Sequence, residues 1–102
     1  MKLFFVYNPM SGRGQIRNKL FDIINVFSEA GYEVTVHPTR APKDATAVVA
    51  ELSDTYDLVV CSGGDGTLDE VMTGMMQRKH IVMPLTHPVV LVMIHWGMLR
   101  NH

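Results

Sequence analysis

The chain of 102 residues has little cysteine, no excess of charge and no long unbroken apolar run. Its single cysteine, Cys61, excludes an intrachain disulfide, and its place in an apolar stretch predicts a buried, unreactive thiol. The nine Lys and Arg residues against ten Asp and Glu leave a net charge of −1. The composition therefore gives no argument for a nucleic-acid partner.

No segment has the pattern of a leader or a membrane span. The N-terminal apolar run ends at Asn8-Pro9 and is too short for a signal peptide. Residues 81–99 are apolar in bulk, but prolines and histidines interrupt them, whereas a spanning helix needs a nearly unbroken apolar run. We therefore expect a cytoplasmic chain of one domain, without a transmembrane segment.

Two common nucleotide-binding motifs are also absent. The sequence has no Gly-x-x-x-x-Gly-Lys-Ser/Thr, which excludes a P-loop NTPase. It has no Gly-x-Gly-x-x-Gly after a strand, so the usual dinucleotide fingerprint is missing.

What is present is a series of three strand–helix units. Apolar, partly β-branched runs predict strands, and apolar residues spaced by three and four predict helices. The expected strands are 3–7, 33–37 and 58–60, and the expected helices are 15–30, 43–53 and 68–77, with Gly31 as a C-cap. Such units predict an α/β fold over residues 1–80, a three-layer parallel sheet of β-α repeats with helices on both faces.

The turn after the third expected strand carries three glycines around one acid. Gly63, Gly64 and Gly66 let the backbone approach a ligand closely, and the start of the next helix favours phosphate. Thr67 is expected to cap that helix, with Glu70 completing a capping box. Asp65 would then be a carboxylate beside the phosphate, available to a magnesium ion or a reacting hydroxyl. The alternative is a plain strand-to-helix turn in which the glycines serve the turn alone.

Two further loops should meet this turn, because ligands bind beyond the carboxyl ends of parallel strands. The loop at residues 8–14 offers the polar side chains of Asn8 and Ser11, and Gly12 lets a backbone N–H face a phosphate. Arg13 could contact phosphate as well. The alternative for this loop is a helix entry with Ser11 as a cap and Arg13 in solvent, and Thr39 alone would be a turn residue.

Together, Asn-Pro-Met-Ser-Gly-Arg-Gly at residues 8–14 and Gly-Gly-Asp-Gly-Thr-Leu-Asp-Glu-Val at residues 63–71 resemble the diacylglycerol kinase catalytic domain. The likeness is greatest to the bacterial soluble lipid kinases of that family, which are related in fold to NAD kinases and phosphofructokinases. It covers about the first three quarters of the chain. The resemblance implies a diacylglycerol kinase-like N-terminal domain that binds ATP and Mg²⁺.

The same resemblance implies transfer of the γ-phosphoryl group to a lipid hydroxyl at a membrane surface. Asp65 would orient Mg-ATP and would interact with the Mg²⁺ ion that the nucleotide carries. Thr39 would touch the nucleotide. Asp69 and Glu70 stand where the family usually has a polar residue and Glu. The other residues expected to bind the nucleotide are Asn8, Ser11, Gly12, Arg13, Gly63, Gly64, Gly66, Thr67 and Glu70. Such chemistry needs positioning and charge neutralisation more than a nucleophile.

Residues 81–102 depart from the family pattern. The family continues with a fourth strand and a Pro-x-Gly-Thr-x-Asn-Asp segment, followed by a β-rich domain, and we expect neither in this sequence. Read from the third base of each codon, residues 87–97 can encode Pro-x-Gly-Thr-x-Asn-Asp-x-Leu-Gly. Our hypothesis is that 81–102 is the frameshifted end of a longer lipid kinase gene. A stop codon in the shifted frame of the coding DNA would exclude it.

Three functions are compatible with these motifs. The first is the nucleotide-binding part of a lipid kinase, weak or inactive alone because the acceptor-lipid site and the usual base are missing. The second is a non-catalytic nucleotide-binding module that self-associates, since residues 89–94 could form a fourth strand or pair with another copy as a homodimer. The third is a NAD kinase-like enzyme, against which the Asn-Pro-x-Ser-Gly loop argues.

Overall fold

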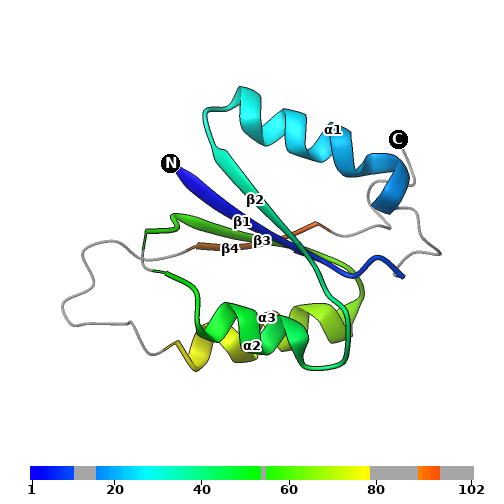
Figure 1. Cartoon of the computed structure of the whole chain (residues 1–102), viewed down its shortest axis with the longest axis vertical. Helices are drawn as coiled ribbons and strands as arrows, with labels where there is room; N and C mark the ends of the chain where they lie inside the picture. Colours follow the sequence, from blue (N-terminus) through cyan, green and yellow to red (C-terminus); the bar gives the residue numbers. More distant parts are fainter. Residues whose placement is uncertain (11–15, 54, 79–89, 95–102) are drawn as a thin grey trace.

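A four-stranded sheet lies between two helical layers in the computed structural model, which describes residues 1–10, 16–53, 55–78 and 90–94 (Figure 1). The strands are β1 (Lys2–Tyr7), β2 (Glu33–Pro38), β3 (Leu58–Ser62) and β4 (Val90–Ile94). The helices are α1 (Ile16–Glu29), α2 (Asp44–Ala50) and α3 (Asp65–Met76). The order is β2-β1-β3-β4, with every neighbouring pair parallel. The predicted three-layer α/β fold is confirmed.

The two faces of the sheet carry separate apolar cores, because side chains alternate along a strand. Phe4 and Val6 of β1 pack with Val59 and Cys61 of β3 on the face covered by α2 and α3. The core on the other face consists of Leu3, Phe5 and Val60 from the strands and Ile16 from α1, all fully buried. Figure 1 shows α1 on one side of the sheet and α2 with α3 on the other. Strands buried on both faces explain their nearly continuous apolar sequences.

The boundaries of helix α2 differ from the predicted ones. Lys43 has a left-handed φ of 71°, so α2 begins only at Asp44, and it ends at Ala50 rather than at residue 53. After α1, Gly31 takes a φ of 96°, and its N–H donates to the Ser28 carbonyl at 3.0 Å. This confirms the predicted glycine C-cap.

The start of α3 also differs from expectation, because the helix begins at Asp65, three residues before the expected start. Gly64 is the N-cap residue, with φ −89° and ψ −172°, and no side chain caps the helix. The predicted capping box of Thr67 and Glu70 is therefore wrong. Thr67 lies inside the first turn, where its N–H donates to the Gly64 carbonyl at 3.1 Å. Gly64 ends the extended segment after β3 without a capping side chain, so α3 starts earlier than a Thr67 cap would allow.

Of the two alternatives for residues 89–94, a fourth strand in the sheet is present as β4 (Val90–Ile94), although the family's fourth strand was not expected. It pairs in parallel with β3, in a register that runs from Leu58 opposite Val90 to Ser62 opposite Ile94. Val89, the first residue of the expected strand, lies outside the described residues. Pairing of β4 with a second copy stays a prediction. Among the residues described here, no helix is both long and apolar enough to cross a membrane.

Cys61 lies in β3 and is fully buried, as predicted. Burial raises the pKa of its thiol to about 11. Since the thiolate is the reactive form, we expect Cys61 to resist a thiol reagent in the folded chain at about pH 8 and to react at once in denaturant. Labelling followed by absorbance measures both rates. Equal rates with and without denaturant would show that the thiol is not protected.

Candidate functional site

The carboxyl ends of β1, β2 and β3 are tied together by the first residues of the loops that follow them. The Asn8 N–H donates to the Ser62 carbonyl at 3.2 Å, which joins the end of β1 to the end of β3. The Thr39 N–H donates to the Tyr7 carbonyl at 2.9 Å, which joins the end of β2 to β1. The predicted convergence of these loops at one edge of the sheet is therefore confirmed for their described parts.

A cavity of about 330 Å³ opens where these loops meet the first two turns of α3. This volume lies at the small end of the range for sites that bind small molecules. Its lining combines polar and charged side chains with small apolar ones: Asn8, Met10, Thr39, Arg40, Ala41, Pro42, Ala45, Thr67 and Glu70. Four of these, Asn8, Thr39, Thr67 and Glu70, are residues that the sequence predicted for nucleotide binding.

The glycine turn borders the cavity rather than lining it. Gly63 is buried, and a Cβ placed on it would overlap the Thr67 side chain, with Thr67 Cβ at 2.7 Å. A Cβ on Gly64 or Gly66 would meet nothing within 4 Å, because both residues are exposed. Gly63 is thus required by packing, whereas Gly64 and Gly66 leave open space in front of the helix start.

The start of α3 presents groups suited to an anion. An α-helix leaves its first N–H groups without intrahelical acceptors, here those of Asp65 and Gly66, at the positive end of its dipole. Asp65 is exposed in this first turn and does not line the cavity. Its carboxylate therefore stands beside the helix start, where a cation bridging to a phosphate could reach it.

Asn8 is partly committed to its own loop. Its Oδ1 accepts a hydrogen bond from the Met10 N–H at 2.9 Å, as in an Asx-turn. The side-chain NH₂ group remains as a donor toward the cavity that Asn8 lines. Ser11, Gly12 and Arg13, which were predicted to bind phosphate from the same loop, lie outside the described residues.

Helix α2 forms one wall of the cavity, and a hydrogen bond and close packing join it to α3. Thr46 Oγ1 donates to the Glu70 carbonyl at 2.7 Å. One turn further along α3, a Cβ on Gly74 would lie 2.7 Å from the Thr46 carbonyl oxygen and 2.9 Å from Val49 Cβ. The two helices therefore touch at a glycine, and this close contact sets the distance between Ala45 and Glu70 across the cavity.

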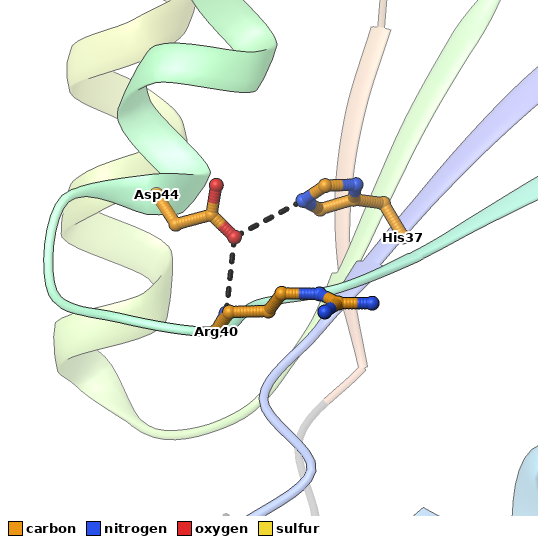
Figure 2. A network of polar contacts seen from close by, with 3 residues as sticks. All are labelled: His37, Arg40 and Asp44. Carbon is orange, nitrogen blue, oxygen red and sulfur yellow. Dashed lines mark hydrogen bonds and ion pairs between the residues drawn. The ribbon is translucent and has the colours of Figure 1, made fainter.

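The loop between β2 and α2 is held by a polar network that the sequence did not reveal (Figure 2). Asp44 Oδ2 lies 3.1 Å from His37 Nε2 and accepts the Arg40 N–H at 3.0 Å. Partial burial raises the pKa of Asp44, but the Arg40 N–H, the His37 ring and the positive charge of Arg40 together outweigh it and leave the pKa below its usual value. The ionised carboxylate is therefore the form that fastens this loop.

Metal binding by the protein alone is not supported in the described part of the chain. No group of three or more His, Cys, Asp or Glu residues is placed there to hold an ion. Mg²⁺ is commonly held by one or two carboxylates together with substrate phosphates and water. The exposed Asp65 beside the helix start fits that mode of binding, in which the nucleotide supplies the other ligands.

Comparison with known proteins identifies the relatives. The diacylglycerol kinase catalytic domain model matches residues 2–97, further than the three quarters of the chain expected from the motifs. A diacylglycerol kinase of Bacillus subtilis (strain 168) is 39% identical over 71 residues, which are 69% of this chain and 23% of that protein. A diacylglycerol kinase of Staphylococcus aureus (strain bovine RF122 / ET3-1) is 36% identical over 76 residues, which are 74% of this chain and 24% of that protein.

A solved structure of a diacylglycerol kinase has the same fold as this chain. A crystal structure of a diacylglycerol kinase from Bacillus anthracis str. Sterne superposes with a TM-score of 0.71 at 27% identity, over 92% of this chain and 32% of that one. The chain thus spans about a quarter of the curated relatives it matches and about a third of this structure.

Proposed function

The chain belongs to the diacylglycerol kinase catalytic domain family, and we propose that it forms the nucleotide-binding part of an ATP-dependent lipid kinase. The reaction proposed for the whole protein is transfer of the γ-phosphoryl group of Mg-ATP to the hydroxyl of diacylglycerol or a related lipid at a membrane surface. The observation that carries the proposal is the cavity between the strand ends and α3, which brings together Asn8, Thr39, Thr67 and Glu70.

Each part of this site has a role in the proposal. The exposed helix start around Gly64 and Gly66 receives phosphate oxygens on its N–H groups. Thr39 and Glu70 face the nucleoside in the cavity. Asp65 helps to hold Mg²⁺, which would neutralise the charge that develops on the transferred group. The residues present thus supply binding and charge stabilisation.

A second candidate is a nucleotide-binding module that does not catalyse and that self-associates through β4. The observation in its favour is the position of β4, an apolar strand at the edge of the sheet. Incubation of the chain with Mg-ATP and diacylglycerol in mixed micelles separates the two candidates. Phosphorylated lipid would support the kinase, whereas binding without turnover, together with a dimer in sedimentation, would support the module.

Substitution of Asp65 by Asn tests the site directly. We expect Asp65→Asn to weaken binding of Mg-ATP about tenfold while leaving the weaker binding of metal-free ATP unchanged, because only the carboxylate's contribution to the ion is removed. Isothermal titration calorimetry with Mg²⁺ and with a chelator measures both. Asp22→Asn is the matched control, since Asp22 is an exposed acid on α1, on the other face of the sheet. Equal loss in both variants would remove Asp65 from the site.

A further inference from the structure

We propose that Arg40 contacts the phosphates of the nucleotide, and that Asp44 is the positioning residue that holds the Arg40 backbone for this contact. The inference rests on the proposed function and adds to it a cation from a third loop, besides the glycine turn and the loop at residues 8–14 in which Arg13 was predicted to contact phosphate. Arg40 lies in the loop between β2 and α2 and was not among the residues predicted from the sequence.

The first ground is the place of Arg40 and the freedom of its side chain. Arg40 lines the cavity together with Thr39 and Thr67, and it is exposed. Within the described ranges, it is the one cation of the lining, and its guanidinium makes no hydrogen bond or ion pair there. Figure 2 shows the side chain extending away from the Asp44 carboxylate rather than pairing with it. A guanidinium that lines a cavity and donates no hydrogen bond to a described residue is available to an anionic ligand.

The second ground is the anchoring of its backbone. Asp44 Oδ2 accepts the Arg40 N–H at 3.0 Å and lies 3.1 Å from His37 Nε2 (Figure 2). The His37 ring in turn stacks on Phe4 of β1, with ring centroids 6.0 Å apart. The carboxylate therefore connects the loop to the core of the domain. The main chain of Arg40 is fixed while its guanidinium stays free, so less order has to be gained when a ligand binds.

The third ground is the charge of the site. Glu70 contributes a carboxylate to the lining, and Asp65 and Asp69 are exposed acids on the first turns of α3. A polyanionic nucleotide next to these acids needs cations besides Mg²⁺ and the helix start. The planar guanidinium fork matches two phosphate oxygens, which distinguishes Arg40 from a simple point charge.

The test compares nucleotides that differ only in phosphate number. Dissociation constants of adenosine, AMP, ADP and ATP, each with Mg²⁺, are measured by titration of the chain and of Arg40→Ala. We expect Arg40→Ala to weaken the binding of ATP about tenfold, to weaken that of ADP less, and to leave that of adenosine unchanged. The reason is the loss of charge-assisted hydrogen bonds to phosphate. Arg40→Lys keeps the charge without the fork and should recover part of the loss. Lys43→Asn is the control, because it removes a neighbouring charge outside the cavity lining at a left-handed position that Asn tolerates.

The positioning role of Asp44 has a separate readout. Asp44→Ala removes the acceptor of the Arg40 N–H and should reduce the preference for ATP over adenosine, whereas Asp44→Asn keeps an acceptor oxygen and should restore most of it. If Arg40→Ala and the unsubstituted chain bound ATP with equal affinity, the inference would be overturned, but the proposed function would not. An equal loss for adenosine and ATP would also overturn it, since Arg40 would then contact the nucleoside. Absence of nucleotide binding by the unsubstituted chain would overturn the proposed function and the inference with it.

Discussion

Replacing Gly63 with alanine is expected to destabilise the domain by roughly 1–3 kcal/mol and to abolish nucleotide binding. The new Cβ would overlap the side chain of Thr67, whose own Cβ lies 2.7 Å away. Thr67 is only 8% exposed and sits in the first turn of α3, so it cannot move aside without moving the helix start. Urea unfolding followed by fluorescence gives the stability, and calorimetry with Mg-ATP gives the binding.

The neighbouring glycine provides the control. A Cβ on Gly64 would meet nothing within 4 Å, and its φ of −89° suits any residue. Gly64→Ala should therefore cost no more than about 1 kcal/mol, as expected for an N-cap without a side-chain acceptor. If Gly63→Ala were as stable as Gly64→Ala, the close packing of the turn against Thr67 would not exist in solution.

The second large effect is expected at Gly74, where α3 touches α2. Alanine there would place a Cβ 2.7 Å from the Thr46 carbonyl oxygen and 2.9 Å from Val49 Cβ, so that the helices must separate. We expect a loss of roughly 1–3 kcal/mol in the free energy of unfolding. We also expect weaker ATP binding, because the Thr46–Glu70 hydrogen bond and the cavity wall lie one turn away. Unfolding in urea and titration with Mg-ATP measure the two losses.

Gly66 is the matched control on the same helix for the loss of stability. It is exposed, and a Cβ there would meet nothing within 4 Å. Gly66→Ala should stabilise the helix by about 0.5–1 kcal/mol through the better helix propensity of alanine. Since Gly66 belongs to the helix start that is proposed to receive phosphate, the same variant should bind ATP less well. Stabilisation by Gly74→Ala would contradict the close helix contact.

The architecture was predictable because each strand–helix unit leaves a strong local pattern. The apolar runs around Phe5 and Val60 predict strands buried on both faces, and parallel strands bring their carboxyl ends to one edge. The convergence of Asn8, Thr39 and the glycine turn follows from that topology. The sequence therefore predicts where the candidate site lies before any side chain is placed.

The details that were missed depend on contacts between distant segments. Both Gly64 and Thr67 can precede a helix, and the sequence does not show that Thr67 is buried in the first turn. Arg40 looks like an ordinary turn residue. The contacts on which its proposed role rests form only when the loop between β2 and α2 brings Asp44 to the Arg40 N–H and to His37. Such a network has no periodic pattern that a sequence alone could reveal.

The most direct test of the central claim is a titration of the isotopically labelled chain with Mg-ATP, followed through its backbone amide resonances. A nucleotide site at the strand ends predicts saturable shifts at Asn8, Thr39 and Thr67 and in the first turn of α3. Phe21 and Val26, exposed on α1, should not shift. Shifts centred on α1, or none at millimolar nucleotide, would contradict the account.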